Sequence, residues 1–224
     1  MRQIERGGGP IMKFIGLHSA LLTAILAIAF SLAGSADGSG RNAPRPRASS
    51  KIEYCKDCHG ASGQGYHGYL VMPRLAGQTP EYFENQLRAF AERTRERALF
   101  INMARVHGMS PEMRAALATQ FSGLNPSPFG GGPRHLVATG RQIFQEGVPE
   151  ANVPACAACH GPEAQGEGPN ARLAGQLFPY TIKELKNWSS ERGADSQAAI
   201  MAPIARALSE SQIVAIAAYL SYLK

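Results

Sequence analysis

One short motif, Cys-x-x-Cys-His, occurs twice in this sequence, as CKDCH at residues 55–59 and as CAACH at residues 156–160. At this spacing each thiol can add to one vinyl group of a haem, and the His that follows can bind the iron as the proximal ligand. The motif therefore predicts two covalently bound haem c groups with their iron. The predicted thioether cysteines are Cys55, Cys58, Cys156 and Cys159, and the predicted proximal ligands are His59 and His160.

The four cysteines have three competing interpretations. A structural zinc ion needs four ligands at suitable spacing, and two separated triads do not supply them. A thioredoxin-like pair needs a βαβ setting, of which the sequence shows no sign. Disulfides are the usual state of cysteines in exported proteins, but they do not explain why a His follows the second Cys each time. Haem attachment is therefore the favoured interpretation.

The two motifs belong to a longer internal repeat. The sequence RLAGQ occurs at residues 74–78 and again at residues 172–176, an offset of 98. A repeat of this length indicates two copies of one domain. At the same offset Tyr82 corresponds to Tyr180, Leu87 to Leu185 and Met103 to Met201.

The segment between the copies, SGLNPSPFGGGP at residues 122–133, contains four Gly and three Pro. This composition supports neither a helix nor a central strand and predicts a linker. We therefore expect a first domain at residues 37–121 and a second at residues 134–224. A domain of about 90 residues is small for an independent core, and a buried haem would supply much of the missing apolar contact.

Apolar side chains recur with helical periodicity in both copies. Residues 81–93 and 181–189 each show the spacing of an amphipathic helix. Ser110 is expected to cap a helix over residues 113–121. Ser209, with a Gln three residues later, has the capping-box pattern and should begin the last helix. No segment shows a convincing strand pattern, so the predicted fold class is all-α.

A Met is the candidate sixth iron ligand in each copy. Met201 follows His160 by 41 residues, and a thioether ligand favours the reduced iron. Met103 occupies the corresponding place in the first copy, where the following segment is one residue shorter. For the first haem, Met109 and a His therefore remain as alternative sixth ligands. The His candidates are His67 and His107, and Met72 is a further Met candidate. The competing interpretation of each Met is a core side chain.

The first 36 residues are predicted to be a targeting segment. Arg2, Arg6 and Lys13 precede an apolar stretch at residues 14–33, and small residues follow it. This is the pattern of a cleaved signal peptide, although the stretch approaches the roughly 20 apolar residues that a membrane anchor needs. The rest of the chain is exported whether this segment is a cleaved signal peptide or a membrane anchor. The predicted location is the periplasm, with membrane association through the N-terminus as the alternative.

The formal net charge of +6 is modest, and without a dense Lys/Arg run nucleic acid is not expected as a partner. Residues 37–121 hold twelve Lys/Arg against eight Asp/Glu, whereas residues 134–224 hold eight of each. The basic first domain is therefore expected to meet an acidic redox partner. The side chains predicted for this face are Arg88, Arg93, Arg95 and Arg97.

Three longer stretches surround these features. They are CKDCHG with PRLAGQ in the first copy, VPACAACHG with RLAGQ in the second, and LSESQIVAIAAYLSYL near the end. Together they resemble the dihaem cytochrome c4 family over residues 51–224. The resemblance implies two class I cytochrome c domains in tandem, packed as a pseudo-symmetric pair, each wrapped around a covalent haem with His/Met ligation.

The resemblance also implies local details of each haem site. The carbonyl of Pro73 should accept a hydrogen bond from the proximal His, and Ala171 replaces that Pro in the second copy. Gly140 and Phe144 resemble the close-packing pair on the first helix of a class I domain. In the first domain residues 41–50 are an extended lead-in, which leaves only about residues 49–54 for a helix before the haem motif, so the helix there should be short.

These observations predict a dihaem electron carrier rather than an enzyme, because no non-haem catalytic constellation is evident. The expected partners are a donor of the quinol-cytochrome c reductase type and an acceptor of the terminal-oxidase type, in a periplasmic respiratory chain. One alternative is a cytochrome subunit of a dehydrogenase complex. Another is a haem enzyme or sensor, which would require a five-coordinate first haem.

Overall fold

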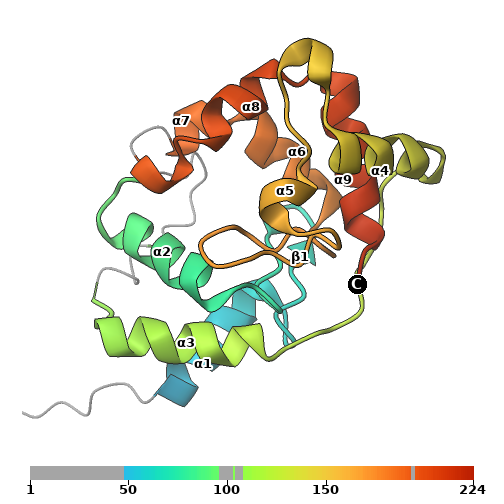
Figure 1. The fold of residues 1–224 in the computed structure, drawn as a ribbon. Helices are drawn as coiled ribbons and strands as arrows, with labels where there is room; N and C mark the ends of the chain where they lie inside the picture. The colour runs from blue at the N-terminus through green and yellow to red at the C-terminus, as the bar shows by residue number, and fades with distance from the viewer. Residues whose placement is uncertain (1–47, 96–102, 104–107, 193–194) are drawn as a thin grey trace, which may run out of the picture. The chain divides into compact units, whose positions relative to one another are not determined.

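The computed structural model describes residues 48–95, 103, 108–192 and 195–224, so the predicted targeting segment lies outside it. These residues are mostly helical, as predicted (Figure 1). None of the described helices has both the length and the hydropathy needed to cross a membrane. The α-helices are α1 (Ala48–His59), α2 (Pro80–Ala91), α3 (Pro111–Ser122), α4 (Val137–Glu146), α5 (Ala157–His160), α6 (Phe178–Lys186), α7 (Trp188–Arg192), α8 (Met201–Ala207) and α9 (Glu210–Tyr222). Short 3₁₀ helices span Arg134–Leu136, Pro149–Ala151 and Ser196–Ala198.

The predicted helix caps are confirmed. The Ser110 hydroxyl accepts a hydrogen bond from the backbone N–H of Met113 at 3.3 Å, which starts α3. Ser209 and Gln212 form the complete capping box at the start of α9. Each cap satisfies backbone donors that the first helical turn leaves without partners, so the sequence alone located these helix starts.

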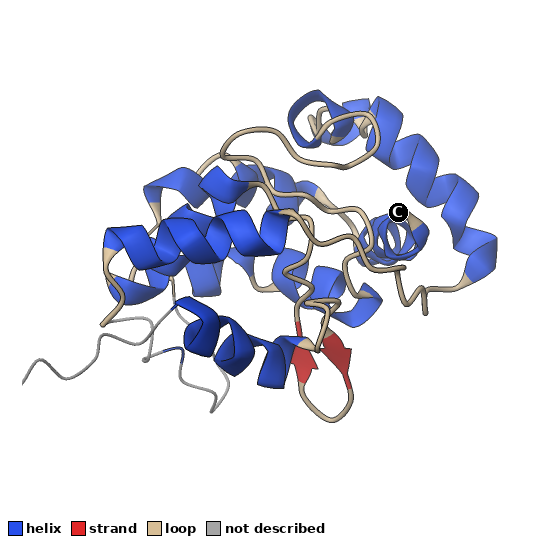
Figure 2. Ribbon diagram, turned by 90° about the horizontal axis from the view of Figure 1, so that it is seen from below, coloured by secondary structure: helices blue, strands red, loops and turns tan. Residues whose placement is uncertain are grey.

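The all-α fold class is confirmed, and the described residues add one short hairpin that no sequence pattern indicated. β1 (Tyr66–His67) and β2 (Val71–Met72) form a small antiparallel hairpin, in which Tyr66 pairs with Met72 and His67 with Val71. Figure 2 shows it in red. Strands of two residues are too short to show an alternating pattern in the sequence, which is why the periodicity analysis missed them.

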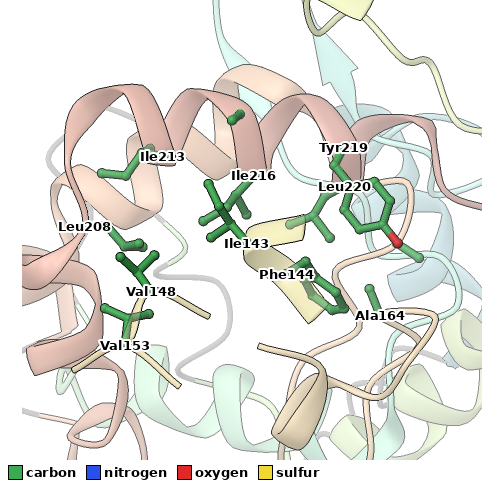
Figure 3. Close-up of a cluster of buried hydrophobic side chains, with 12 residues drawn as sticks. Ile143, Phe144, Val148, Val153, Ala164, Leu208, Ile213, Ile216, Tyr219 and Leu220 are labelled. Atoms are coloured by element: carbon green, nitrogen blue, oxygen red, sulfur yellow. The ribbon is translucent and has the colours of Figure 1, made fainter. Parts of the chain in front are cut away.

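The core of the second domain lies where α4 and α9 cross. Gly140 allows the close approach, because a Cβ at this position would overlap the carbonyl oxygen of Ala215. One turn later the Phe144 side chain is fully buried, with its ring centroid 5.6 Å from that of Tyr219. Figure 3 shows side chains of the two helices pointing toward one another. Gly140 and Phe144 therefore form the packing pair that the resemblance implied.

The first domain has a separate core between α2 and α3. The rings of Phe83 and Phe121 stack with centroids 5.5 Å apart, and Leu117 is fully buried beside them. Helix α1 continues through the haem motif, with seven residues before Cys55. The second domain instead has a whole separate helix, α4, before its motif. The leading helix of the first domain is thus short, as expected.

The predicted linker contains no helix or strand from Leu124 to Pro133. It runs beside the C-terminal end of α9, where the backbone N–H of Gly130 donates to the carbonyl of Ser221 at 3.1 Å. The Tyr222 hydroxyl donates to the carbonyl of Gly132 at 2.6 Å. These contacts attach the loop to the second domain.

We expect Gly140→Ala to destabilise the protein by about 3 kcal/mol, because the added methyl group must push α4 away from α9. Guanidinium denaturation followed by circular dichroism measures the loss. The matched control is Gly123→Ala, where the backbone has φ −75° and the nearest atoms lie at an ordinary 3.8 Å from a built Cβ. The control should change stability by less than about 0.5 kcal/mol. Equal losses in both variants would contradict a tightly packed crossing.

Candidate haem-binding site

The first motif lies in the last turns of α1. Cys55 and Cys58 are three residues apart and therefore share one helix face, with Cys55 half-buried and Cys58 exposed. His59 is buried, and its Nδ1 donates a hydrogen bond to the carbonyl oxygen of Pro73 at 2.8 Å. This hydrogen bond selects the tautomer in which Nε2 carries the lone pair that binds a metal.

The second motif repeats this arrangement in and beside α5. His160 is buried, and its Nδ1 donates to the carbonyl oxygen of Ala171 at 2.8 Å. The Ala that replaces Pro73 thus supplies an equivalent acceptor. Burial lowers the pKa of His160, and its hydrogen bond to the Ala171 carbonyl opposes this in part. The net lowering favours the neutral imidazole, which is the form that binds metals.

The state of the cysteines bears on the competing interpretations. None of the four forms a disulfide. Before haem attachment, burial raises the pKa of the Cys55 and Cys156 thiols to about 11, so neither is the thiolate that binds a metal ion at neutral pH. Cys55, Cys156 and Cys159 also line a large cavity.

This cavity runs beside both motifs. Its volume is about 2110 Å³, counting the space at its opening to solvent, and its walls come from both copies of the repeat. Both proximal His candidates line it, as do Met103 and Met201. Much of the remaining wall is apolar and includes Phe83, Leu87, Phe90, Phe144, Ile204 and Ile216.

The charged groups of the cavity wall also fit haem, which is an apolar ring carrying two carboxylates. The Nε atoms of Arg95 and Arg172 are buried without a hydrogen-bond partner, and both side chains line the cavity. A buried donor without an acceptor is costly, and haem carboxylates are suitable acceptors for guanidinium groups. The residues present therefore fit haem in shape, polarity and charge.

The candidate sixth ligands differ in whether they line the cavity. Met201, at the start of α8, and Met103 both line the cavity. Met109 is buried in the core between α2 and α3 and is not among the cavity residues. Met72 is buried in β2, whereas His67 is exposed with its ring 4.7 Å from that of Phe129. His107 lies outside the described residues.

Two glutamines at the ends of the repeated RLAGQ segments join the two copies. The Gln176 side chain accepts from the backbone N–H of Arg74 at 2.8 Å and donates to the Arg74 carbonyl at 3.1 Å. Gln78 makes the same pair of hydrogen bonds with Arg172, at 2.6 and 3.1 Å. The repeat was predicted from the sequence, but this role of the two glutamines was not. A Gln repeated at the same offset was the available signal.

The predicted docking face needs a correction at Arg95. Its side chain is only 8% exposed, whereas Arg88 and Arg93 are exposed and Arg97 lies outside the described residues. Helix α2 ends at Ala91, and Arg93 then has a left-handed φ of 59°. The chain therefore leaves the helix face that the sequence analysis assumed, and Arg95 turns inward.

Arg95 belongs to a buried cluster of Arg95, Gln86, Arg192 and Glu184, which we call the arginine ring. Arg95 donates to Gln86 at 2.6 Å and to Glu184 at 3.2 Å. Arg192 donates to Gln86 at 2.9 Å and, through its Nε, to Glu184 at 2.9 Å. Two hydroxyl groups also accept from the ring, Tyr180 from Arg95 at 3.0 Å and Tyr82 from Arg192 at 3.1 Å.

Known proteins share this architecture. The family model for cytochrome c matches residues 52–126 and 137–224. Cytochrome c-552 of Acidithiobacillus ferridurans is 36% identical over 211 residues, covering 92% of this chain and 86% of its own. The thiosulfate dehydrogenase electron acceptor of Thiomonas intermedia (strain K12) is 35% identical over 217 residues, 93% of each chain. The solved structure of Acidithiobacillus ferrooxidans cytochrome c4 matches with a TM-score of 0.67 and 33% identity, over 76% of this chain and 99% of that one.

The chain belongs to the dihaem cytochrome c4 family.

Membership in the cytochrome c4 family confirms the predicted cofactor and the broad function. The protein carries two haem c groups on its two Cys-x-x-Cys-His motifs and is a dihaem electron carrier. The haem supplies the one-electron chemistry. The chain's own residues attach it, hold the imidazole tautomers through Pro73 and Ala171, and surround it with apolar walls.

The ion pairs of Glu184 predict a specific loss of stability in acid. Burial alone would raise its pKa, but Arg192 and Arg95 lower it from 4.5 to about 2. A carboxylate with a lowered folded-state pKa stabilises the fold above its unfolded-state pKa, and this stability is lost as the pH falls through the folded-state value. The shift corresponds to about 3 kcal/mol. Hence the stability difference between the parent and Glu184→Gln should be about 3 kcal/mol at pH 7 and should shrink between pH 5 and pH 2.

Guanidinium denaturation at several pH values measures this difference. Glu146→Gln is the matched control, because Glu146 is exposed and accepts a hydrogen bond from the side-chain amide of Gln142 at 3.0 Å. The free energy of unfolding of this control should differ from that of the parent by a small amount that is the same at every pH. If the difference in the free energy of unfolding between the parent and Glu184→Gln did not change from pH 7 to pH 2, the lowered pKa would be contradicted.

Proposed function

We propose that this protein is a periplasmic electron carrier in which each haem iron has one His and one Met ligand. It passes single electrons from a respiratory donor to an acceptor of the terminal-oxidase type. One observation supports the proposal above all: both His and both Met candidates line the same cavity. The proposed ligand pairs are His59 with Met103 and His160 with Met201.

The proposed ligands suit a carrier better than an enzyme. A thioether ligand stabilises ferrous iron and raises the reduction potential. An iron with two protein ligands has no coordination position open to a substrate. Met103 and Met201 are both half-buried in the cavity wall, where neighbouring apolar side chains limit access of water. The periplasmic location rests on the predicted targeting segment at residues 1–36.

Carbon monoxide tests the ligand assignment. We expect both irons of the reduced parent to be low-spin and not to bind carbon monoxide. Met103→Leu and Met201→Leu should each leave one haem iron without its sixth ligand. Half of the haem should then bind carbon monoxide, and one of the two midpoint potentials should fall. Visible spectra and a redox titration measure both effects.

Met109→Leu is the matched control, because Met109 lies in the core and should leave the spectra unchanged. Carbon monoxide binding by the parent would favour the enzyme or sensor alternative. Binding by Met109→Leu together with a parent-like Met103→Leu would assign the ligand to Met109.

A second candidate function is to accept electrons directly from a dehydrogenase. It is favoured by the 35% identity to a thiosulfate dehydrogenase electron acceptor. The two functions use the same haems and differ in the donor. Mixing the ferric protein with purified thiosulfate dehydrogenase and thiosulfate in a stopped-flow spectrometer distinguishes them. Rapid haem reduction supports the second function, and reduction no faster than without the enzyme contradicts it.

The same measurement tests the docking face left after the correction at Arg95. Arg88 and Arg93 remain exposed on the basic first domain. Replacing both with Glu should slow association with an acidic donor several-fold at low salt and little at high salt, because salt screens exposed charges over about 10 Å. The matched control reverses Arg141 and Arg206, which are exposed on the second domain. An equal effect of both pairs at low salt would exclude a specific face on the first domain.

A further inference from the structure

The arginine ring is almost symmetric between the two copies of the repeat. Gln86 and Glu184 occupy equivalent positions, at the offset of 98 that also relates Tyr82 to Tyr180. Arg95 of the first copy donates to Glu184 and Tyr180 of the second. In return, Arg192 of the second copy donates to Gln86 and Tyr82 of the first. The hydrogen bonds are thus reciprocal, although Arg95 and Arg192 are 97 rather than 98 positions apart. The chemical difference between the two halves is at Gln86 and Glu184, an amide in one copy and a carboxylate in the other.

This difference leaves the ring with a net charge. Arg95 and Arg192 contribute two positive charges, Glu184 one negative charge, and Gln86 none. The adjacent ion pair of Lys183 and Glu191, at 2.6 Å, adds no net charge. All four ring residues are buried, with exposed fractions of 9% for Gln86, 8% for Arg95, 7% for Glu184 and 3% for Arg192. The four ring side chains together thus carry one formal positive charge.

The charge faces the haem sites. All four ring residues line the cavity that both Cys-x-x-Cys-His motifs line, and the buried Nε of Arg95 has no hydrogen-bond partner. Because the four ring side chains are themselves buried, solvent screens the ring less than it screens a surface charge.

We propose that the arginine ring tunes the reduction potentials of the two haems through the net charge of its own side chains, one positive charge before the haem carboxylates are counted, and that Gln86 and Glu184 determine the size and placement of that charge. Reduction converts each Fe(III) to Fe(II) with one electron from the donor, and no bond forms or breaks. The haem site therefore loses one positive charge on reduction. A nearby positive charge favours the ferrous state and raises the potential, and a nearby negative charge lowers it.

Three near-isosteric variants of the holoprotein test the proposal. Glu184→Gln raises the ring charge to +2, and at least one midpoint potential should rise. Gln86→Glu lowers the charge to zero, and at least one potential should fall. A unit charge acting over about 10 Å of protein changes the ferrous-to-ferric ratio by about tenfold, which is about 59 mV for one electron. The double variant keeps +1 but moves the carboxylate to the first copy, so the mean of the two potentials should return to the parent value.

Spectroelectrochemical titration measures these potentials, and visible spectra establish whether the iron ligands are intact. Glu146→Gln is the control, because it removes the same charge from an exposed position and should shift neither potential measurably. Opposite shifts in the two single variants, with recovery in the double variant, support the proposal. Potentials unchanged in both single variants, or shifts of the same sign, would overturn it.

Gln86→Glu keeps the proposal testable if Glu184→Gln does not fold, because a second carboxylate between the two arginines adds an attractive contact. The inference depends on the presence of both haems but not on their Met ligands or on any redox partner. Carbon monoxide binding by the parent would contradict the proposed ligation and would leave this test unaffected.

Discussion

The structure depends on two equivalent hydrogen bonds of 2.8 Å, from His59 to the Pro73 carbonyl and from His160 to the Ala171 carbonyl. Each orients an imidazole and joins a haem-motif helix to the loop that carries RLAGQ. The residue directly after each of these carbonyls is an Arg whose backbone is held by the Gln of the other copy. The orientation of each proximal His is therefore coupled to the contact between the two domains, through one peptide unit. In such an arrangement ligand geometry and domain packing form together.

The two halves of the molecule are related by sequence but differ where their surroundings differ. The guanidinium of Arg74 donates to Pro126 and Asn125 of the linker, whereas the Nε of Arg172 has no partner. The linker at residues 122–133 supplies these acceptors to the Arg of the first domain. Together with the amide and carboxylate of the arginine ring, these differences make the polar groups contributed by the two copies unequal. A dihaem carrier can use such a difference to order the movement of electrons within one chain.

Local signals in the sequence predicted much of the fold and of the site. The Cys and His of each motif are adjacent in the chain, so their joint role follows from spacing alone. Ser110 and Ser209 cap helices through hydrogen bonds to residues three positions later, which is again a local interaction. The short hairpin at Tyr66 was missed because two-residue strands carry no periodic signal. Arg95 was misplaced because the end of α2 and the left-handed turn at Arg93 leave little trace in the charge pattern.

The sequence by itself determined that the protein has two covalent haem motifs, two copies of one helical domain and a Met at the same place in each copy. It also contained the difference between Gln86 and Glu184, but not the fact that both residues belong to one buried cluster. Only the tertiary structure decided that Met103 rather than Met109 lines the cavity, that the repeated glutamines join the domains, and that Arg95 and Arg192 enclose both Gln86 and Glu184. The physical reason is that the contacts between the two copies connect residues 85 to 110 positions apart. Their partners are chosen by how the two domains pack, which no local pattern records.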